Sequence, residues 1–229
     1  MNTLLIRRFV RRIIQEKAKS VSSAQSSGLA LFLNYPSGYG ATRIILYNPS
    51  KLLDIFEETF GNPTTEEITH SILGVVETEK WDGSPCNNVG NVINATAAEK
   101  GWGPLLYDVA LSISNGGLMP DRGSVSSKAS SVWNYYDKKR GDVKSIPLDN
   151  EDDPKTPSPK DDCPFVKGPE YVNKVYKMTG SGVNVGDLAR NHNVFIEQMK
   201  KNYKEASKEA VESMVARSAL QFFTSKYDG

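Results

Sequence analysis

Residues 94–107 contain the most informative run of this chain, NATAAEKGWGPLLY. The run begins inside a segment rich in β-branched and small residues, residues 89–97, which predicts a strand. Gly101 and Gly103 follow, and a proline then opens an apolar segment with helical spacing, which predicts a helix over residues 105–114. The sequence therefore places a glycine turn between a strand and a helix.

This turn has the features of an anion-binding site. Glycine lets the backbone approach a ligand closely, because it has no Cβ. The first turn of a helix presents unpaired N–H groups, and the helix dipole favours a negative charge there. A pyrophosphate group would suit such a turn. The same Gly-x-Gly spacing is also typical of a plain strand-to-helix connection, so the spacing alone leaves both interpretations open.

The segments before the turn alternate between predicted strands and one predicted helix. Two apolar segments, residues 28–34 and 41–47, flank a stretch rich in Gly and Pro, which predicts an antiparallel hairpin. Asn48 begins a predicted helix over residues 51–60. Residues 68–78 are rich in Ile, Leu and Val and predict another strand.

The segments after the turn predict a second α/β half. Residues 118–119 predict a short strand, and residues 127–140 predict a helix. Residues 145–169 are rich in Pro, Asp and Lys and predict a solvated loop; its carboxylates are oxygen ligands, but they lack the spacing of a calcium-binding EF-hand. Residues 171–178 predict a last strand, and residues 194–223 predict one long helix.

The N-terminus is the most basic part of the chain. Residues 1–19 hold six Lys or Arg residues and one Glu, and their apolar residues recur at helical spacing, which predicts a basic amphipathic helix. Arginines interrupt the apolar core that a secretory signal needs. The composition by itself also fits a mitochondrial presequence. The interpretation that we favour is a helix that docks on the body of the protein or on a protein partner. Residues 20–28 are rich in serine and predict a hinge.

Composition excludes several classes of protein. The net charge of the whole chain is +1, so no strong nucleic-acid-binding signal is present. No apolar run approaches the roughly 20 residues of a transmembrane helix. The two cysteines, Cys86 and Cys163, permit at most one disulfide, and the two histidines, His70 and His192, lie far apart, so we expect no metal site.

Residues 98–103, Ala-Glu-Lys-Gly-Trp-Gly, resemble the coenzyme-A-binding motif of the GNAT superfamily of N-acetyltransferases, Gln/Arg-x-x-Gly-x-Gly/Ala. The resemblance covers about residues 68–178, where the runs GWGPLLYDVAL, GLMPDR and VWNYY are similar to those of GNAT-like proteins of tailed bacteriophages. It implies an α+β fold in which a mixed, mostly antiparallel sheet is flanked by helices, with helical extensions at both ends. The motif would then connect the fourth strand to the third helix.

The resemblance also implies acetyl-coenzyme A (acetyl-CoA) as cofactor and a set of binding residues. The residues that would contact the cofactor are Ala98, Glu99, Lys100, Gly101, Trp102, Gly103, Leu105 and Leu106. One departure is that Ala98 stands where the motif has Gln or Arg, so a side-chain contact to phosphate is missing.

Catalytic candidates follow from the same resemblance. Many members place a tyrosine on the helix after the fifth strand as general acid, and this position is Trp133 here, so Tyr136 and Tyr135 are the candidates. Glu77 and Glu79, on or after the strand that precedes the motif, are the candidate bases. Core packing for the tyrosines and solvated strand-end positions for the carboxylates are the alternative interpretations.

We therefore expect three regions: a basic helix and hinge over residues 1–27, a GNAT-like domain over residues 28–178, and a C-terminal helical extension over residues 179–229. The expected function is acetyl-CoA-dependent acyl transfer to an unidentified amine. The alternative, favoured by Ala98 and Trp133, is a catalytically degenerate structural or interaction protein of a phage virion. The expected location is the host cytoplasm or the virion.

Overall fold

A seven-stranded sheet runs through the part of the chain that the computed structural model describes, which is residues 19–35, 41–80, 91–149, 163–203 and 206–227. In chain order the strands are β1 (Ala30–Asn34), β2 (Ala41–Tyr47), β3 (Ile72–Lys80), β4 (Asn91–Ala98), β5 (Leu118–Pro120), β6 (Val143–Pro147) and β7 (Lys174–Met178). Their order in the sheet is β1-β2-β3-β4-β5-β7-β6. Every pair of neighbours is antiparallel except β4 and β5, which are parallel.

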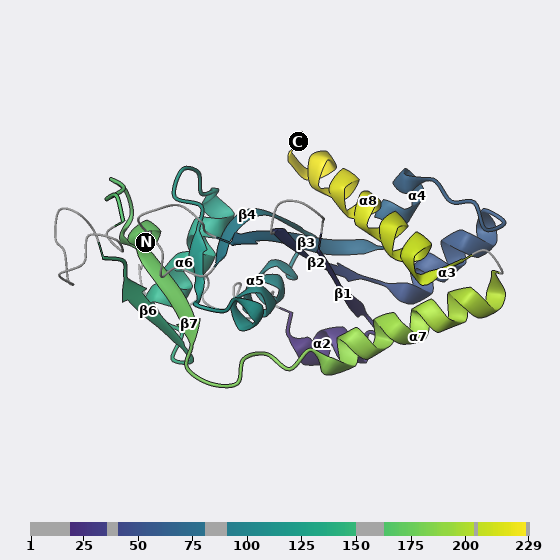
Figure 1. The fold of residues 1–229 in the computed structure, drawn as a ribbon, viewed down its shortest axis with the longest axis horizontal. Helices are drawn as coiled ribbons and strands as arrows, with labels where there is room; N and C mark the ends of the chain where they lie inside the picture. The colour runs from purple at the N-terminus through teal and green to yellow at the C-terminus, as the bar shows by residue number, and fades with distance from the viewer. Residues whose placement is uncertain (1–18, 36–40, 81–90, 150–162, 204–205, 228–229) are drawn as a thin grey trace, which may run out of the picture.

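Helices cover both faces of this sheet, which confirms the predicted α+β class with a mostly antiparallel sheet. The helices are α2 (Val21–Ser26), α3 (Pro49–Glu58), α4 (Thr65–Thr69), α5 (Gly103–Ile113), α6 (Ser127–Lys138), the 3-10 turn η1 (Glu170–Asn173), α7 (Gly186–Asn202) and α8 (Lys208–Tyr227). Helices α7 and α8 lie at the end of the molecule near β1, and β6 and β7 lie at the other end (Figure 1).

Alternate residues of the strands supply two separate cores, because successive side chains of a strand point to opposite faces. On one face, Val76 of β3 belongs to a cluster with Leu106 of α5 and Trp133 of α6. On the other face, Val75 belongs to a cluster with Phe195 of α7 and Val215 of α8. The glycine turn leads into α5, so the first face is the one that carries the predicted motif.

Local capping signals confirm two of the predicted helices. The side chain of Asn48 accepts a hydrogen bond from the N–H of Lys51, and Pro49 occupies the first turn of α3, where its missing N–H costs nothing. The side chain of Ser126 likewise accepts from the N–H of Ala129 at the start of α6. The predicted hairpin is also confirmed, because β1 and β2 pair in antiparallel register.

Some predicted segments differ from the structure in type or in bounds. The first residues of the predicted strand 68–78 belong to α4, because Thr64 and Glu67 form a reciprocal capping box. The predicted serine-rich hinge is the helix α2, capped by Ser20. The predicted loop 145–169 begins inside β6, which pairs with β7.

The predicted single helix over residues 194–223 is wrong, because α7 ends at Asn202 and α8 begins at Lys208. Helix α7 packs along β1, whereas α8 packs against α4 and β3, so the chain has to change direction between them. Tyr203 lies at this break, and its ring centroid is 5.5 Å from that of Phe56 in α3. The predicted basic helix of residues 1–19 lies outside the described residues, except for Lys19.

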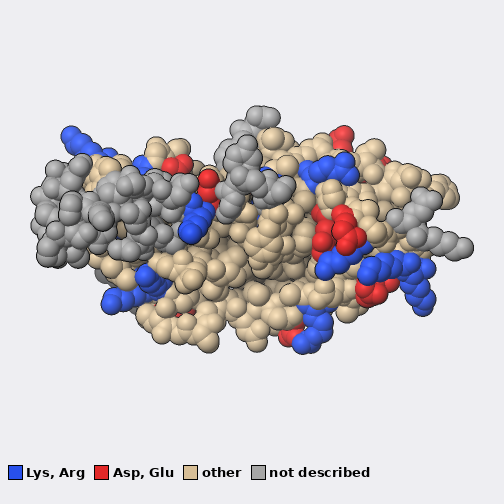
Figure 2. Space-filling model, viewed as in Figure 1, with Lys and Arg blue, Asp and Glu red and all other residues tan. Residues whose placement is uncertain are grey.

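Charged side chains of both signs are interspersed on the face drawn in Figure 2. The described part of this face therefore offers no extended basic surface of the kind that binds nucleic acid. Among the described helices, none combines the length and the apolar character that crossing a membrane requires.

Alanine at position 117 is expected to lower the free energy of unfolding by about 2 kcal/mol, because its backbone conformation would be strained and its Cβ would overlap neighbouring atoms. Gly117 has a φ of +107°, and a Cβ there would lie 2.7 Å from the carbonyl oxygen of Tyr176. Gly180→Ala is the matched control, since its Cβ would meet no atom within 4 Å. Urea unfolding of both variants measures the difference, and equal stabilities would contradict the tight junction between β5 and β7.

Candidate functional site

The glycine turn leaves β4 at Ala98 and enters α5 at Gly103. The N–H of Trp102 donates to the carbonyl oxygen of Glu99 at 3.1 Å, which closes the turn. Gly101 has a φ of +93°, a conformation that L side chains rarely adopt, so this position requires glycine. The first glycine of the turn, Gly101, is therefore explained by the backbone conformation alone.

The start of α5 has backbone that a ligand can approach. A Cβ built on Gly103 would meet no atom within 4 Å, and its φ is compatible with any residue. Trp102, the residue before the helix, is buried and provides no side-chain cap for the first N–H groups. An open approach and an uncapped helix N-terminus fit a phosphate group.

Two lysines distant in sequence lie beside this turn. The backbone N–H of Lys19 donates to the carbonyl oxygen of Gly101 at 2.9 Å, and its Nζ lies 4.4 Å from the ring centroid of Trp102. At the end of α8, the Nζ of Lys226 lies 2.7 Å from an oxygen of Glu99. Segments from both ends of the described chain therefore meet at the turn, and each brings a positive charge near the N-terminus of α5.

Strand β4 pairs with β5 over a short stretch only. The paired residues are Asn91 with Leu118, Val92 with Met119, and Ile93 with Pro120. Strand β5 ends at Pro120, whereas β4 continues to Ala98 beside β3. The β3–β4 register shifts after Glu77, so Asn94 stands in a bulge. In the described residues, the last half of β4 thus has a strand partner on its β3 side only.

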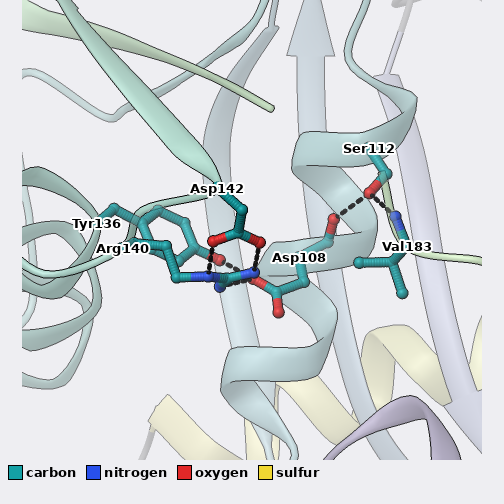
Figure 3. A network of polar contacts seen from close by, with 6 residues as sticks. All are labelled: Asp108, Ser112, Tyr136, Arg140, Asp142 and Val183. Carbon is teal, nitrogen blue, oxygen red and sulfur yellow. Dashed lines mark hydrogen bonds and ion pairs between the residues drawn. The ribbon is translucent and has the colours of Figure 1, made fainter. Parts of the chain in front are cut away.

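Tyr136, the first of the predicted catalytic residues, belongs to a polar network between α5 and α6 (Figure 3). Its hydroxyl donates to a carboxylate oxygen of Asp108 in α5. Arg140 donates to the same oxygen through Nη1 at 2.7 Å, and it holds Asp142 through Nε at 2.6 Å and Nη2 at 2.8 Å. These hydrogen bonds and ion pairs connect the C-terminal end of α6 to the middle of α5.

The network shifts the pKa values of Tyr136 and Asp142. Burial, and then the Asp108 carboxylate, raise the pKa of Tyr136 well above its ordinary value, so the phenol keeps its proton. The hydrogen bonds from Arg140 lower the pKa of Asp142. To act as a general acid, Tyr136 would have to exchange Asp108 for another acceptor.

The two neighbouring aromatic residues on α6 lie in different surroundings. Trp133 is 1% exposed, with ring centroids of Tyr107 and Tyr176 at 5.5 and 5.0 Å. Tyr135 is 44% exposed, and its ring contacts that of Tyr136. The position that the resemblance assigns to a catalytic tyrosine is therefore part of an aromatic core.

The two predicted carboxylates of β3 lie on the other face of the sheet from α5. Glu77 and Glu79 share the face of Val75, as the alternation of the strand requires. Glu77 accepts from Nε of Arg43 at 2.5 Å, and Glu79 accepts from the side-chain amide of Asn94 at 2.6 Å. The structure thus does not bring these carboxylates together with the predicted tyrosines.

The predicted cofactor-binding residues do lie together, around the turn. Glu99 and Lys100 are exposed, whereas the side chains of Leu105 and Leu106 are buried, so the two leucines present only backbone atoms. Ala98 packs against the core that contains α5. The side chains that face solvent at the turn are therefore few and charged.

Sequence analysis missed the network of Asp108, Arg140 and Asp142. One signal was present, because Asp108 is the single charged residue of α5, GPLLYDVALSI. A carboxylate inside an apolar helix requires a partner when it is partly buried. The partner lies 32 residues further along the chain, at Arg140, which only the tertiary structure identifies.

The described residues contain no group of three or more His, Cys, Asp or Glu side chains that could hold a metal ion. Cys163 is disulfide-bonded, so its thiol is not a nucleophile. Cys86 lies outside the described residues.

The chain was compared with models of protein families, with curated proteins and with solved structures. None of these comparisons gave a match.

Proposed function

We propose that this chain is a GNAT-like protein that binds acetyl-CoA at the glycine turn and transfers the acetyl group to an amine. The observation that carries the proposal is the end of β4–β5 pairing at Ile93, ahead of a glycine turn that leads into α5. A parallel pair inside an otherwise antiparallel sheet, with a helix after each of its strands, supports the same assignment.

The backbone of the turn would hold the phosphates. The N–H groups of Trp102 and Leu106 already donate within the turn and helix, and Pro104 has none. We therefore assign the N–H groups of Gly103 and Leu105 to a phosphate. Lys19 would supply the positive charge that Ala98 does not. Acetyl-CoA itself would supply an activated acyl group as a thioester.

Acyl transfer also requires proton transfer from the amine and to the departing sulfur. We assign Tyr136 or Tyr135 as the acid. Glu77 and Glu79 remain the candidate bases, but they could act only on an amine that reaches the sulfur from the face of the sheet opposite α5, where both carboxylates lie. The test is a thiol-release assay with acetyl-CoA and a panel of primary amines. Amine-dependent release of thiol is the expected result, and no release with any amine would overturn acyl transfer.

A second candidate function is a catalytically degenerate structural or interaction protein of a phage particle. It is favoured by the hydrogen bond that ties Tyr136 to Asp108 and by the burial of Trp133 in the aromatic core. In that case the α6 aromatics stabilise the fold and the wild-type protein has no turnover.

We further propose that the basic N-terminal segment docks on a protein partner. Deleting residues 1–18 is expected to leave the melting temperature within a few degrees, because Lys19 and its contacts with the turn remain. The deletion is expected to abolish assembly with the partner. Thermal melting and light scattering measure the two effects, and a collapse of the whole fold would assign the segment to the core instead.

A further inference from the structure

His192 of α7 lies at a buried junction between the sheet and the two C-terminal helices. The residue is 6% exposed, and its ring stacks on Phe32 of β1 at a centroid distance of 4.8 Å. Both ring nitrogens have partners. Nδ1 lies 2.8 Å from the hydroxyl of Tyr47 in β2, and Nε2 lies 3.0 Å from a carboxylate oxygen of Glu212 in α8.

The partners fix the tautomer of the neutral ring. A carboxylate only accepts hydrogen bonds, so Nε2 carries the proton and donates to Glu212. Nδ1 then accepts from the hydroxyl of Tyr47, which is fully buried. Burial, and then the charge of Glu212, raise the pKa of Tyr47, so this phenol remains a donor. The neutral network is therefore complete.

A second proton on His192 disrupts this network. Nδ1 would then donate, and the O–H of Tyr47 would have to turn away into apolar surroundings without its acceptor. Among the residues that the structure describes, the charged groups that face the ring come from α8. They are Glu212 and Lys208, whose Nζ lies 3.7 Å from the same carboxylate oxygen. Burial lowers the pKa of His192 by more than Glu212 raises it.

We propose that His192 forms a pH-sensitive contact that holds α8 against α7 and the sheet. Its protonation would weaken this contact and favour local opening of α8. At its far end, α8 carries Lys226, which pairs with Glu99 of the glycine turn. Acidification would therefore weaken the contact of α8 with the turn as well. This inference does not depend on what the turn binds.

The direction of the effect follows from linkage. The pKa of His192 in the folded protein is below the value of about 6.5 for a free histidine. The neutral ring therefore contributes its full stability above about pH 6.5, and this contribution is lost as the pH falls through the lowered pKa. Because one proton is involved, the equilibrium constant for opening of α8 rises by at most about tenfold for each pH unit of acidification.

The experiment uses the full chain and measures amide hydrogen-exchange protection in α8 between about pH 7.5 and pH 5. The chain has two histidines, and His70 is exposed, so His70→Gln is the matched control. His192→Gln can still donate to Glu212 and accept from Tyr47, but it does not titrate. We expect protection in α8 to fall with pH in the wild type and in His70→Gln, and to stay nearly constant in His192→Gln. An equal fall in all three proteins would overturn the proposal.

A second measurement keeps the proposal testable if His192→Gln does not fold. In His70→Gln, His192 is the single histidine, so its imidazole resonance can be followed by NMR as the pH changes. The expected result is that the His192 resonance titrates with a midpoint below about pH 6.5, and that the resonances of α8 show exchange broadening over the same pH range. A midpoint at or above that value would overturn the proposal.

Discussion

Valine at position 103 is expected to lower the affinity for acetyl-CoA by at least about 100-fold, which is about 2.7 kcal/mol. The branched side chain would occupy the space through which a phosphate reaches the first turn of α5. The fold itself should tolerate the change, because a Cβ on Gly103 meets no protein atom within 4 Å. The loss of affinity can therefore be separated from a loss of stability.

The measurement is the rise in melting temperature with increasing acetyl-CoA, since a ligand stabilises the state that binds it. The wild type is expected to show the rise, and Gly103→Val is expected to show none. Gly180→Val is the matched control, because its Cβ also meets open space, and Gly180 lines a hollow at the C-terminal end of α5 rather than at the glycine turn. An unchanged shift in a folded Gly103→Val protein would show that the turn is only a strand-to-helix connection.

Phenylalanine at position 136 is expected to lower acyl-transfer turnover by about 10²–10⁴, the usual contribution of a general acid. The ring would still pack between Trp133 and Tyr176, but the hydroxyl would be lost. The same hydroxyl donates to the carboxylate of Asp108, so the variant also removes a structural hydrogen bond to a charged group, at a cost of about 1.5–3 kcal/mol. Turnover and stability have to be measured on the same samples.

Asp108→Asn separates the catalytic role from the structural one. The amide oxygen can still accept from Tyr136, but the negative charge that helps to raise the pKa of this phenol is gone. A catalytic Tyr136 then becomes a stronger acid, so turnover should be retained while Tyr136→Phe loses it. Full turnover in Tyr136→Phe would exclude this hydroxyl, and Tyr135→Phe then tests the remaining tyrosine. No turnover in the wild type would favour the structural candidate.

The elements that sequence analysis predicted correctly are those with strong local signals. Asn48 and Ser126 cap α3 and α6 through their own side chains, and the two apolar segments of the β1–β2 hairpin flank a turn rich in Gly and Pro. The glycine turn was predicted for the same reason, because Gly101 and Gly103 mark it within a few residues.

The elements that it missed depend on contacts distant in sequence. The apolar stripe of α7 continues into α8, so only the different packing partners of the two helices show where the chain turns. Strand β6 has a weak pattern and exists because it pairs with β7. The Asp108–Arg140 pair and the Tyr47–His192–Glu212 junction each join residues at least 20 positions apart, so no local spacing predicts them.

Calorimetric titration of the wild-type full chain with acetyl-CoA tests the central claim most directly. The proposed site predicts saturable heat with one equivalent per chain, and competition by coenzyme A without the acetyl group, because in that site the phosphates would contact the N–H groups of Gly103 and Leu105. The absence of heat for both compounds, from a chain that melts cooperatively, would contradict the assignment of the glycine turn as a coenzyme-binding site.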